Sequence, residues 1–195
     1  MKGRIAVLLF FSAFFLAVSF TGRALPAEQK AVYSRSIENC TIPDVTLVNQ
    51  DGKKVRLREF LPSAKRVIID FIYSTCTTIC PVESANFKNF QERLGPEAAK
   101  VQLLSISIDP EHDTPKAMKE YLKRFYAKEG WTYLTGSRPQ INQVLRAFNA
   151  SEFSDKMENA PRVMMRIPLT DSWIRIDGFI GASTLVEEHR KIKER

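Results

Sequence analysis

Two stretches of the sequence, RVIIDFIYS (residues 66–74) and VQLLSISID (residues 101–109), are nearly continuous runs of apolar residues. Runs of this length, rich in β-branched residues, are typical of strands buried on both faces, as in parallel sheets covered by helices. Between the two runs, Phe87, Phe90 and Leu94 recur at the spacing of one helix face. A strand, a helix and a second strand in this order restrict the chain to an α/β architecture.

The rest of the chain continues this alternation of strands and helices. Asn-Gln-Asp-Gly, residues 49–52, lies between two short alternating runs and predicts a β-hairpin. We therefore predict one α/β domain over residues 40–195, with a mixed sheet, helices on both faces and an N-terminal β-hairpin. The other predicted elements are a helix from Thr114, a strand at 131–134, a helix through Ile141 and Phe148, an antiparallel pair formed by RVMMRI and WIRID, and a helix from about Thr184.

Residues 1–24 have the order of a secretory signal peptide. Lys2 and Arg4 precede an apolar stretch without charges over residues 5–20, and small residues suited to cleavage follow. If that stretch is retained instead of cleaved, it is an N-terminal membrane anchor. Residues 25–39 lack periodicity and are predicted as a linker. Both alternatives make the rest of the chain extracytoplasmic, in the periplasm or on the outer face of a membrane.

The charge of the chain argues against a nucleic-acid partner. The formal net charge is +7, and the first 24 residues hold three basic residues and no acidic one, so that without them it is +4. A charge of that size, spread evenly, does not form the basic patch that nucleic acids require. The C-terminal stretch EEHRKIKER mixes acids with bases, and we interpret it as the solvated face of a helix, with His189 on the surface.

Two cysteines stand where the first buried strand ends and a helix is predicted to begin. Cys76 follows the strand, Cys80 opens the helix, and Pro81 suits its first turn. Ligands collect at the carboxyl edge of a parallel strand, and the N-terminus of a helix stabilises a thiolate. The pair is therefore predicted to act as a nucleophile or a Cu(I) site, since structural zinc requires four ligands. A structural disulfide is the remaining alternative, although so short a loop gains little from closure.

Three segments in order resemble the SCO/SenC family: Cys-x-x-x-Cys-Pro after an apolar strand, ISIDPEHDTPKAMKEYLKRF and LTGSRPQINQVLRAF. The resemblance covers roughly residues 40–180. It implies a thioredoxin-like, membrane-associated or secreted protein that takes part in copper delivery to cytochrome c oxidase. It also implies that Cys76 and Cys80 are the copper-binding, redox-active pair, with a cytochrome oxidase subunit or another extracytoplasmic thiol or copper protein as partner.

One residue that the resemblance implies is missing. The family's third copper ligand is a histidine shortly before a late strand, and here residues 159–161, Asn-Ala-Pro, stand in its place. His112 is an alternative ligand, but a solvated loop or cap residue is the favoured interpretation. Met164 and Met165 lie close to the expected place, but adjacent strand residues face opposite ways and core packing is the competing interpretation. Cu(I) is therefore predicted with its third ligand unidentified.

Asp70 is the third predicted site residue. It precedes Cys76 by six residues, and thioredoxins resemble this stretch in having an acid at that distance, which exchanges protons with the deeper cysteine. A carboxylate in an apolar strand has a raised pKa and can act as acid or base near neutrality. The resemblance implies that Asp70 relays a proton to Cys80, and the alternative is an acid that is partly exposed or paired with a base. Pro161 stands where thioredoxin-like folds have a cis-proline beside the cysteine pair.

These residues leave three functions open. In the first, which we expect, the protein uses Cys76 and Cys80 both to handle Cu(I) and for thiol redox work, and it passes the copper to an oxidase subunit. In the second, it is a copper-independent thiol–disulfide oxidoreductase, in which Cys76 attacks a partner disulfide and Cys80 resolves the mixed disulfide with help from Asp70. In the third, it is a non-catalytic binding module with a structural disulfide. Peroxidase chemistry is disfavoured, because peroxiredoxins resemble the fold but have a threonine where this chain has Tyr73; Cys40 is either a resolving partner or a free thiol.

Overall fold

The two apolar runs of the sequence form the neighbouring strands β4 (Arg66–Ile72) and β5 (Val101–Ser107), which run parallel in the middle of one sheet. The structure, a computed structural model, describes residues 33–154 and 161–193. A third parallel strand, β6 (Trp131–Thr135), pairs with the other edge of β5. Every residue of β5 is buried, as predicted for a strand that is covered on both faces.

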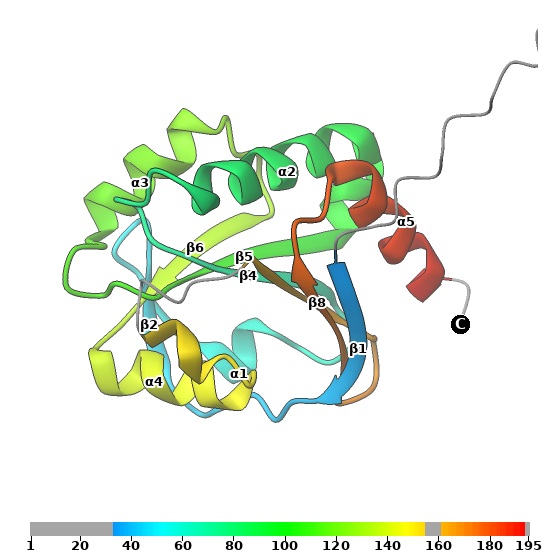
Figure 1. Ribbon diagram of the computed structural model, residues 1–195. Coiled ribbons are helices and arrows are strands. Elements are labelled where there is room, and N and C mark those ends of the chain that lie inside the picture. Colours follow the sequence, from blue (N-terminus) through cyan, green and yellow to red (C-terminus); the bar gives the residue numbers. More distant parts are fainter. Residues whose placement is uncertain (1–32, 155–160, 194–195) are drawn as a thin grey trace, which may run out of the picture. The chain divides into compact units, whose positions relative to one another are not determined.

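Five further strands are β1 (Tyr33–Asn39), β2 (Thr46–Asn49), β3 (Lys54–Arg56), β7 (Arg162–Arg166) and β8 (Ser172–Gly178). They complete a mixed sheet of eight strands in the order β1-β8-β7-β4-β5-β6-β2-β3 (Figure 1). β7 and β8 form the predicted antiparallel pair beside β4, and β2 and β3 form the predicted N-terminal hairpin beside β6. In that hairpin Gly52 adopts a φ of 77°, and the Asn49 side chain accepts hydrogen bonds from two turn amides.

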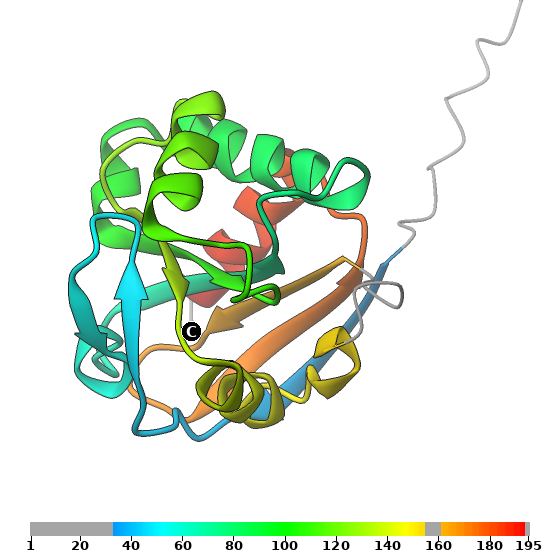
Figure 2. The ribbon, with the colours of Figure 1, turned by 90° about the vertical axis from the view of Figure 1, so that its left-hand side faces the viewer.

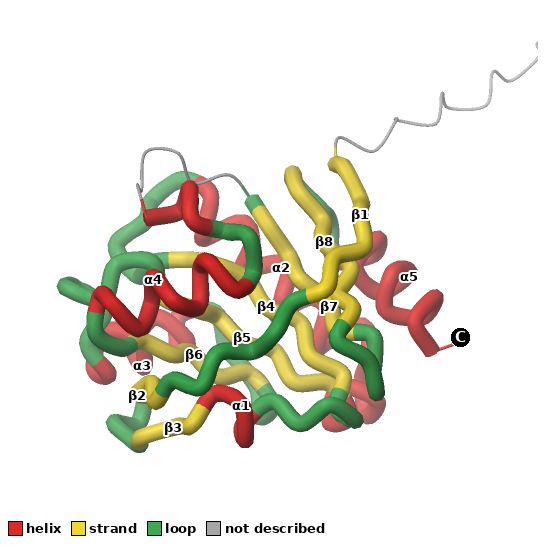
Figure 3. The backbone as a smooth tube through the Cα atoms, turned by 90° about the horizontal axis from the view of Figure 1, so that it is seen from below, coloured by secondary structure: helices red, strands yellow, loops and turns green. Residues whose placement is uncertain are grey.

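Helices cover both faces of the sheet (Figures 1 and 2). One face carries α2 (Ile79–Leu94), α3 (Pro115–Arg124) and α5 (Ala182–Lys193), and the other carries α1 (Leu57–Phe60) and α4 (Arg138–Ala147), the side from which Figure 3 shows the sheet. Two short 3-10 helices are η1 (Gly95–Lys100) and η2 (Ser151–Ser154). Each face has its own buried apolar cluster. This arrangement confirms the predicted α/β class with helices on both faces of a mixed sheet.

The end of the predicted linker, 25–39, is part of the sheet. Its last seven residues form β1, which pairs with β8 from Tyr33 opposite Gly178 to Asn39 opposite Ser172. β1 is an edge strand whose side chains are mostly exposed, so no apolar periodicity marks it in the sequence. Backbone pairing with β8, rather than burial of its own side chains, therefore makes this segment a strand, and the sheet begins before the predicted boundary at residue 40.

His189 on α5 is buried, and the prediction that it lies on the surface is wrong. Its ring meets the ring of Phe90 from α2 edge to face, with centroids 5.7 Å apart at an interplanar angle of 89°. Leu185, His189 and Ile192 follow one another at helical spacing, and all three are buried. The helix packs this stripe against the rest of the molecule, and its charged residues occupy the other positions.

Candidate functional site

Cys76 and Cys80 lie at the carboxyl edge of the sheet, between β4 and α2. β4 ends at Ile72, the chain turns over residues 73–78, and Cys80 is the second residue of α2. Cys76 is 7% exposed and Cys80 is fully buried, and both are free thiols. Of the two sulfurs, the one of Cys76 is therefore the one that solvent or a partner can approach.

The Cys76 sulfur lies over the N-terminus of α2. It accepts a hydrogen bond from the backbone amide of Cys80 at 3.4 Å and lies 3.8 Å from the hydroxyl oxygen of Thr78. Burial of Cys76 opposes ionisation, but hydrogen bonds from the Cys80 thiol and from the backbone amides of Cys80 and Thr78 outweigh it and lower the pKa of Cys76 to about 7. About half of the Cys76 thiol is therefore ionised at neutral pH.

Cys80 has the opposite character. Burial raises the pKa of its thiol far above the ordinary value, and the neighbouring Cys76 raises it further. The pair thus combines an acidic outer thiol with an inner thiol that holds its proton. Such a pair can start a thiol exchange at Cys76, but it requires a proton acceptor before Cys80 can react.

Asp70 lies in the middle of β4 and is fully buried. Among the described residues, neither of its carboxylate oxygens has a hydrogen-bond partner by normal geometry. Burial raises the pKa of Asp70 to about 7, against a smaller opposite effect of Ser105, its neighbour on β5. The alternative of an exposed or base-paired acid therefore does not apply, and Asp70 has the buried, apolar setting that a proton acceptor near neutrality requires.

Glu83 is a site residue that the sequence analysis missed. It follows Cys80 by one helical turn on α2, is buried, and lines a small apolar pocket with Phe87, Pro161 and Phe179. Burial raises the pKa of Glu83 well above its ordinary value, and the charge of Asp70 raises it further. Glu83 stands at helical spacing with the buried Phe87 and Phe90, which was the signal available in the sequence.

The sulfurs of Cys76 and Cys80 are the candidate metal donors of this site. Two thiolates form a soft donor set that suits Cu(I), and the helix N-terminus that favours the Cys76 thiolate favours its role as a ligand. Among the described residues, no cluster of three or more His, Cys, Asp and Glu side chains is arranged to hold a metal ion. The pair thus offers two soft sulfur donors of the kind that Cu(I) accepts. Asn159 and Ala160, which occupy the place of the family's histidine, lie outside the described residues.

The other candidate ligands lie elsewhere. The His112 side chain is 65% exposed, and its Nδ1 lies 3.0 Å from a carboxylate oxygen of Asp109. Met165 stands opposite Ile68 on β4. Ile68 lies four residues before Ile72, the last residue of the strand, so Met165 is roughly 13 Å from the strand end that precedes the cysteines. Met164 belongs to the core of the opposite face. The competing interpretation of both methionines as core residues agrees with their burial.

Cys40 is buried on the face of the sheet opposite to the cysteine pair. It belongs to the cluster under α1 and α4, whereas Cys76 and Cys80 belong to the cluster under α2. Burial raises the pKa of Cys40 to about 11, with a further contribution from the charge of Glu38. In the structure Cys40 is a free thiol separated from the pair by the sheet.

The predicted signal or anchor, residues 1–24, lies outside the described residues, as does most of the linker. In the described ranges, 33–154 and 161–193, no helix has the length and apolar character that a membrane crossing requires.

A sheet of this topology with a cysteine pair between a central strand and the following helix defines the class of thioredoxin-like proteins. Within that class, the profile of the SCO1/SenC family matches residues 36–166. The chain therefore belongs to the SCO1/SenC family.

Relatives of known name agree with this membership. The SCO1 protein homolog of Bacillus subtilis (strain 168) is 35% identical over 115 residues, which make up 57% of this chain and 58% of the relative. Protein SCO1 homolog 1, mitochondrial, of Arabidopsis thaliana is 31% identical over 119 residues, or 59% of this chain and 34% of the relative. The chain thus covers less than two thirds of the length of either relative.

Two solved structures of the Sco family are similar to this fold. BsSco, described as having a disulfide switch and as a member of the Sco family of cytochrome c oxidase assembly proteins, has a TM-score of 0.65 and 26% identity, and the match covers 80% of this chain and 95% of BsSco. ScoI of Bradyrhizobium japonicum with copper bound has a TM-score of 0.50 and 25% identity, over 62% of this chain and 78% of ScoI.

Proposed function

We propose that this chain is an extracytoplasmic protein that handles Cu(I) and exchanges thiols and disulfides during assembly of the copper site of a respiratory oxidase, and that Cys76 and Cys80 serve both tasks. The observation that carries the proposal is the Cys76 sulfur, held at the N-terminus of α2 beside Cys80 with a pKa of about 7. BsSco, an oxidase assembly protein with a disulfide switch, and the copper-bound ScoI support it. The signal-like order of residues 1–24 supports the location.

In the redox step, the Cys76 thiolate attacks one sulfur of a partner disulfide and displaces the other as a thiolate. Cys80 then gives up its proton and attacks the Cys76 sulfur. This attack forms the Cys76–Cys80 disulfide and releases the partner with both thiols reduced, so that two electrons pass from the pair to the partner. Asp70, which is partly ionised at neutral pH, accepts the proton of Cys80, and Glu83 lies beside it as a second buried carboxyl group.

In the copper step, the reduced pair carries Cu(I) as cargo on two thiolates and transfers it to the thiols of the reduced partner. Cu(I) accepts soft sulfur ligands, so a cysteine pair on each protein suits a ligand-by-ligand exchange. Binding displaces the proton of Cys80, and the buried carboxyl pair can accept it in this step as well. A dithiol reductant returns an oxidised pair to the state that binds the metal.

A copper-independent thiol–disulfide oxidoreductase is the second candidate. It is favoured by the sequence Asn-Ala-Pro at residues 159–161, where the family has its histidine ligand. It is also favoured by the buried acids Asp70 and Glu83, whose pKa values are raised by burial, and the charge of Glu83 in turn raises the pKa of Cys80. The third candidate, a module with a structural disulfide, is disfavoured because such a bridge gives no role to an acidified outer thiol.

Anaerobic titration of the reduced protein with Cu(I) against a competing chelator separates these candidates. We expect tight one-to-one binding that is lost in Cys76→Ser and in Cys80→Ser. Cys40→Ser is the matched control, since Cys40 lies on the other face of the sheet, and it should bind copper as the wild type does. Weak binding by the wild type together with rapid reduction of a partner disulfide would assign the second function. If the Cys76–Cys80 disulfide resists mild reductants and its removal changes only the melting temperature, both the copper-handling function and the oxidoreductase function would be overturned.

A further inference from the structure

Asp113 forms the centre of a buried hydrogen-bond network at the sheet edge that carries the cysteines. Its Oδ1 accepts hydrogen bonds from the backbone amide of Ser74, at 2.9 Å, and from the Ser74 hydroxyl. Its Oδ2 accepts them from the Ser107 hydroxyl at 2.6 Å and from the Tyr133 hydroxyl at 2.9 Å. Asp113 and its three partners are all buried.

These partners come from three neighbouring strands. Ser74 follows β4 by two residues, Ser107 is the last residue of β5, and Tyr133 is in the middle of β6. Asp113 itself lies in the loop between β5 and α3, directly before Thr114, the N-cap of α3. Its side chain thus fastens the loop before α3 to the ends of the parallel strands. A buried carboxylate is costly without partners, and four donors on one group make this a specific arrangement.

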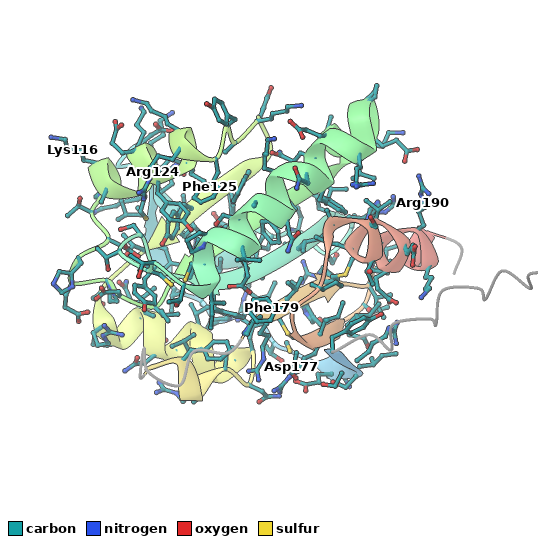
Figure 4. The ribbon with its side chains drawn as sticks, turned by 45° about the horizontal axis from the view of Figure 1, so that its top comes forward. Lys116, Arg124, Phe125, Asp177, Phe179 and Arg190 are labelled. Atoms are coloured by element: carbon teal, nitrogen blue, oxygen red, sulfur yellow. The ribbon has the colours of Figure 1, made fainter. Side chains whose placement is uncertain are left out.

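Ser74 is the partner that connects this network to the cysteines. It stands two residues before Cys76, in the turn that brings the chain from β4 to α2. Asp113 holds the amide and the hydroxyl of Ser74. The carbonyl of Ser74 accepts a hydrogen bond at 3.3 Å from the side chain of Arg124. Arg124 is the last residue of α3 (Figure 4). The amide of Cys76 donates to the carbonyl of Tyr73 at 3.2 Å and closes the turn. Both backbone groups of Ser74 are thus fixed from outside the turn.

We propose that Asp113 is a positioning residue for the cysteine pair: by holding Ser74 it sets the place of the Cys76 sulfur over the N-terminus of α2. Asp113 touches neither sulfur and acts through the Ser74–Cys76 turn. The proposal deepens the proposed function and rests on it for the part that concerns copper. Without the carboxylate, the turn loses the bonds to the Ser74 amide and hydroxyl, and the sulfur is no longer confined to the position where it accepts the amide of Cys80.

Two measurements on the full chain test this role. The first is the Cu(I) affinity of Asp113→Ala and Asp113→Asn by chelator competition, where we expect a loss of about tenfold to a hundredfold for the alanine variant, as for other residues that orient ligands. The asparagine variant, which keeps one acceptor oxygen for Ser74, should lose less. The second is the equilibrium between the Cys76–Cys80 dithiol and its disulfide in a glutathione buffer, which requires no copper. It should shift in both variants, and more in Asp113→Ala than in Asp113→Asn.

Thr114→Ala is the matched control. It removes the neighbouring cap of α3, where the Thr114 hydroxyl accepts from the amide of Ala117 at 3.2 Å, and leaves the bonds to Ser74 in place. We expect it to lower the melting temperature but to keep the copper affinity and the dithiol equilibrium of the wild type. Two results would overturn the positioning role. In the first, the copper affinity and the dithiol–disulfide equilibrium fall in proportion to thermal stability in all variants, Thr114→Ala included. In the second, neither quantity changes in Asp113→Asn and Asp113→Ala. If the wild type itself fails to bind Cu(I), the proposed function fails, while the glutathione equilibrium still decides on Asp113.

Discussion

The Cys76 sulfur takes the place that a polar N-cap side chain has at many helices. Thr78, the N-cap of α2, makes no cap hydrogen bond with its side chain, and the sulfur accepts the amide of Cys80 instead. An acceptor in this place gains from ionisation, because the amide and the helix dipole favour negative charge. The local backbone therefore acidifies Cys76, and no basic side chain is among the causes that lower its pKa.

The contribution of the Cys80 thiol can be tested separately from that of its amide. In Cys80→Ala the thiol donor is lost, so we expect the pKa of Cys76 to rise from about 7 toward an ordinary thiol value of about 8.5. The thiolate fraction at pH 6, and with it the alkylation rate, should then fall by up to about thirtyfold. Cys80→Ser keeps a donor and should stay closer to the wild type. The rate of iodoacetamide alkylation of Cys76 against pH, followed by mass spectrometry, measures both. Identical profiles for the two variants would contradict the thiol hydrogen bond.

At the scale of elements, β4 and α2 bring two acids and two thiols to one place. Asp70 comes from the strand, and Cys80 and Glu83 come from one face of the helix at a spacing of three residues. Burial raises both pKa values, and no basic side chain is among the causes that shift them; for Glu83 only the backbone amide of Arg162 opposes the rise. Ionising either acid in this place therefore costs free energy of folding. Strongly shifted pKa values of this kind are typical of functional sites.

Replacing Asp70 by asparagine should remove that cost. The pKa of Asp70 is about 7 in the folded protein against an ordinary value of 3.8, so the folded state binds this proton more tightly than the unfolded state. The stability that the group contributes is therefore present at low pH and is lost as the pH rises from about 4 to about 7. We expect Asp70→Asn to match the wild type near pH 4 and to exceed it at pH 8 by up to about 4 kcal/mol.

Urea denaturation of wild type and Asp70→Asn at the two pH values measures this difference. Glu59→Gln is a suitable control, because Glu59 is an exposed acid whose side chain is 67% accessible, and it should show no such gain at pH 8. A constant difference between wild type and Asp70→Asn across the pH range would mean that Asp70 is not a buried acid with a raised pKa.

The contact between α2 and α5 is a second feature of this scale. Phe90 is fully buried and packs against the ring of His189, so Phe90→Ala leaves a cavity and should cost about 3–5 kcal/mol of unfolding free energy. Phe179, which is labelled in Figure 4, is 52% exposed, and Phe179→Ala should change stability by less than about 0.5 kcal/mol. Equilibrium unfolding in urea compares the two, and equal losses would rule out the burial of the α2–α5 contact.

At the scale of the whole molecule, the sheet separates two buried apolar cores, and the cysteine pair belongs to one of them. The cluster under α2, α3 and α5 contains both cysteines of the pair, whereas the cluster under α1 and α4 contains Cys40. β1 closes the sheet on one edge, and Arg35 on this strand donates at 2.8 Å to Glu188, a buried acid of α5. The first described strand and the last helix are thus joined, although 153 residues separate these two side chains in the sequence.

A chain that starts at residue 40 should therefore be less stable than one that starts at residue 31. The shorter chain loses the pairing of β1 with β8 and the bond between Arg35 and Glu188. We expect a loss of at least about 2 kcal/mol, with a melting temperature lower by roughly 4–8 °C. Thermal unfolding of the two chains, followed by circular dichroism, measures this loss. Equal melting temperatures would return residues 33–39 to the role of a linker.

Which features could be predicted from the sequence depends on how far apart in the chain the interacting residues lie. The buried strands β4 and β5, the hairpin at Asn49 and Gly52, and the place of Cys76 and Cys80 at a helix N-terminus were predictable, because each depends on a periodicity or a turn signal within a few residues. The family also was recognisable from its three segments. No third metal ligand could be predicted, since the stretch where the family has its histidine holds none.

What the tertiary structure alone decided is burial and pairing between distant segments. β1 is a strand because β8 lies beside it, His189 is buried because α5 packs on α2, and the exposure of Glu83 and Asp70 is set by elements far away in the chain. The network around Asp113 likewise joins residues from three strands and a loop. A sequence encodes local backbone preference directly, but the solvent access of a polar side chain, and with it its pKa, depends on which surfaces meet when the chain has folded.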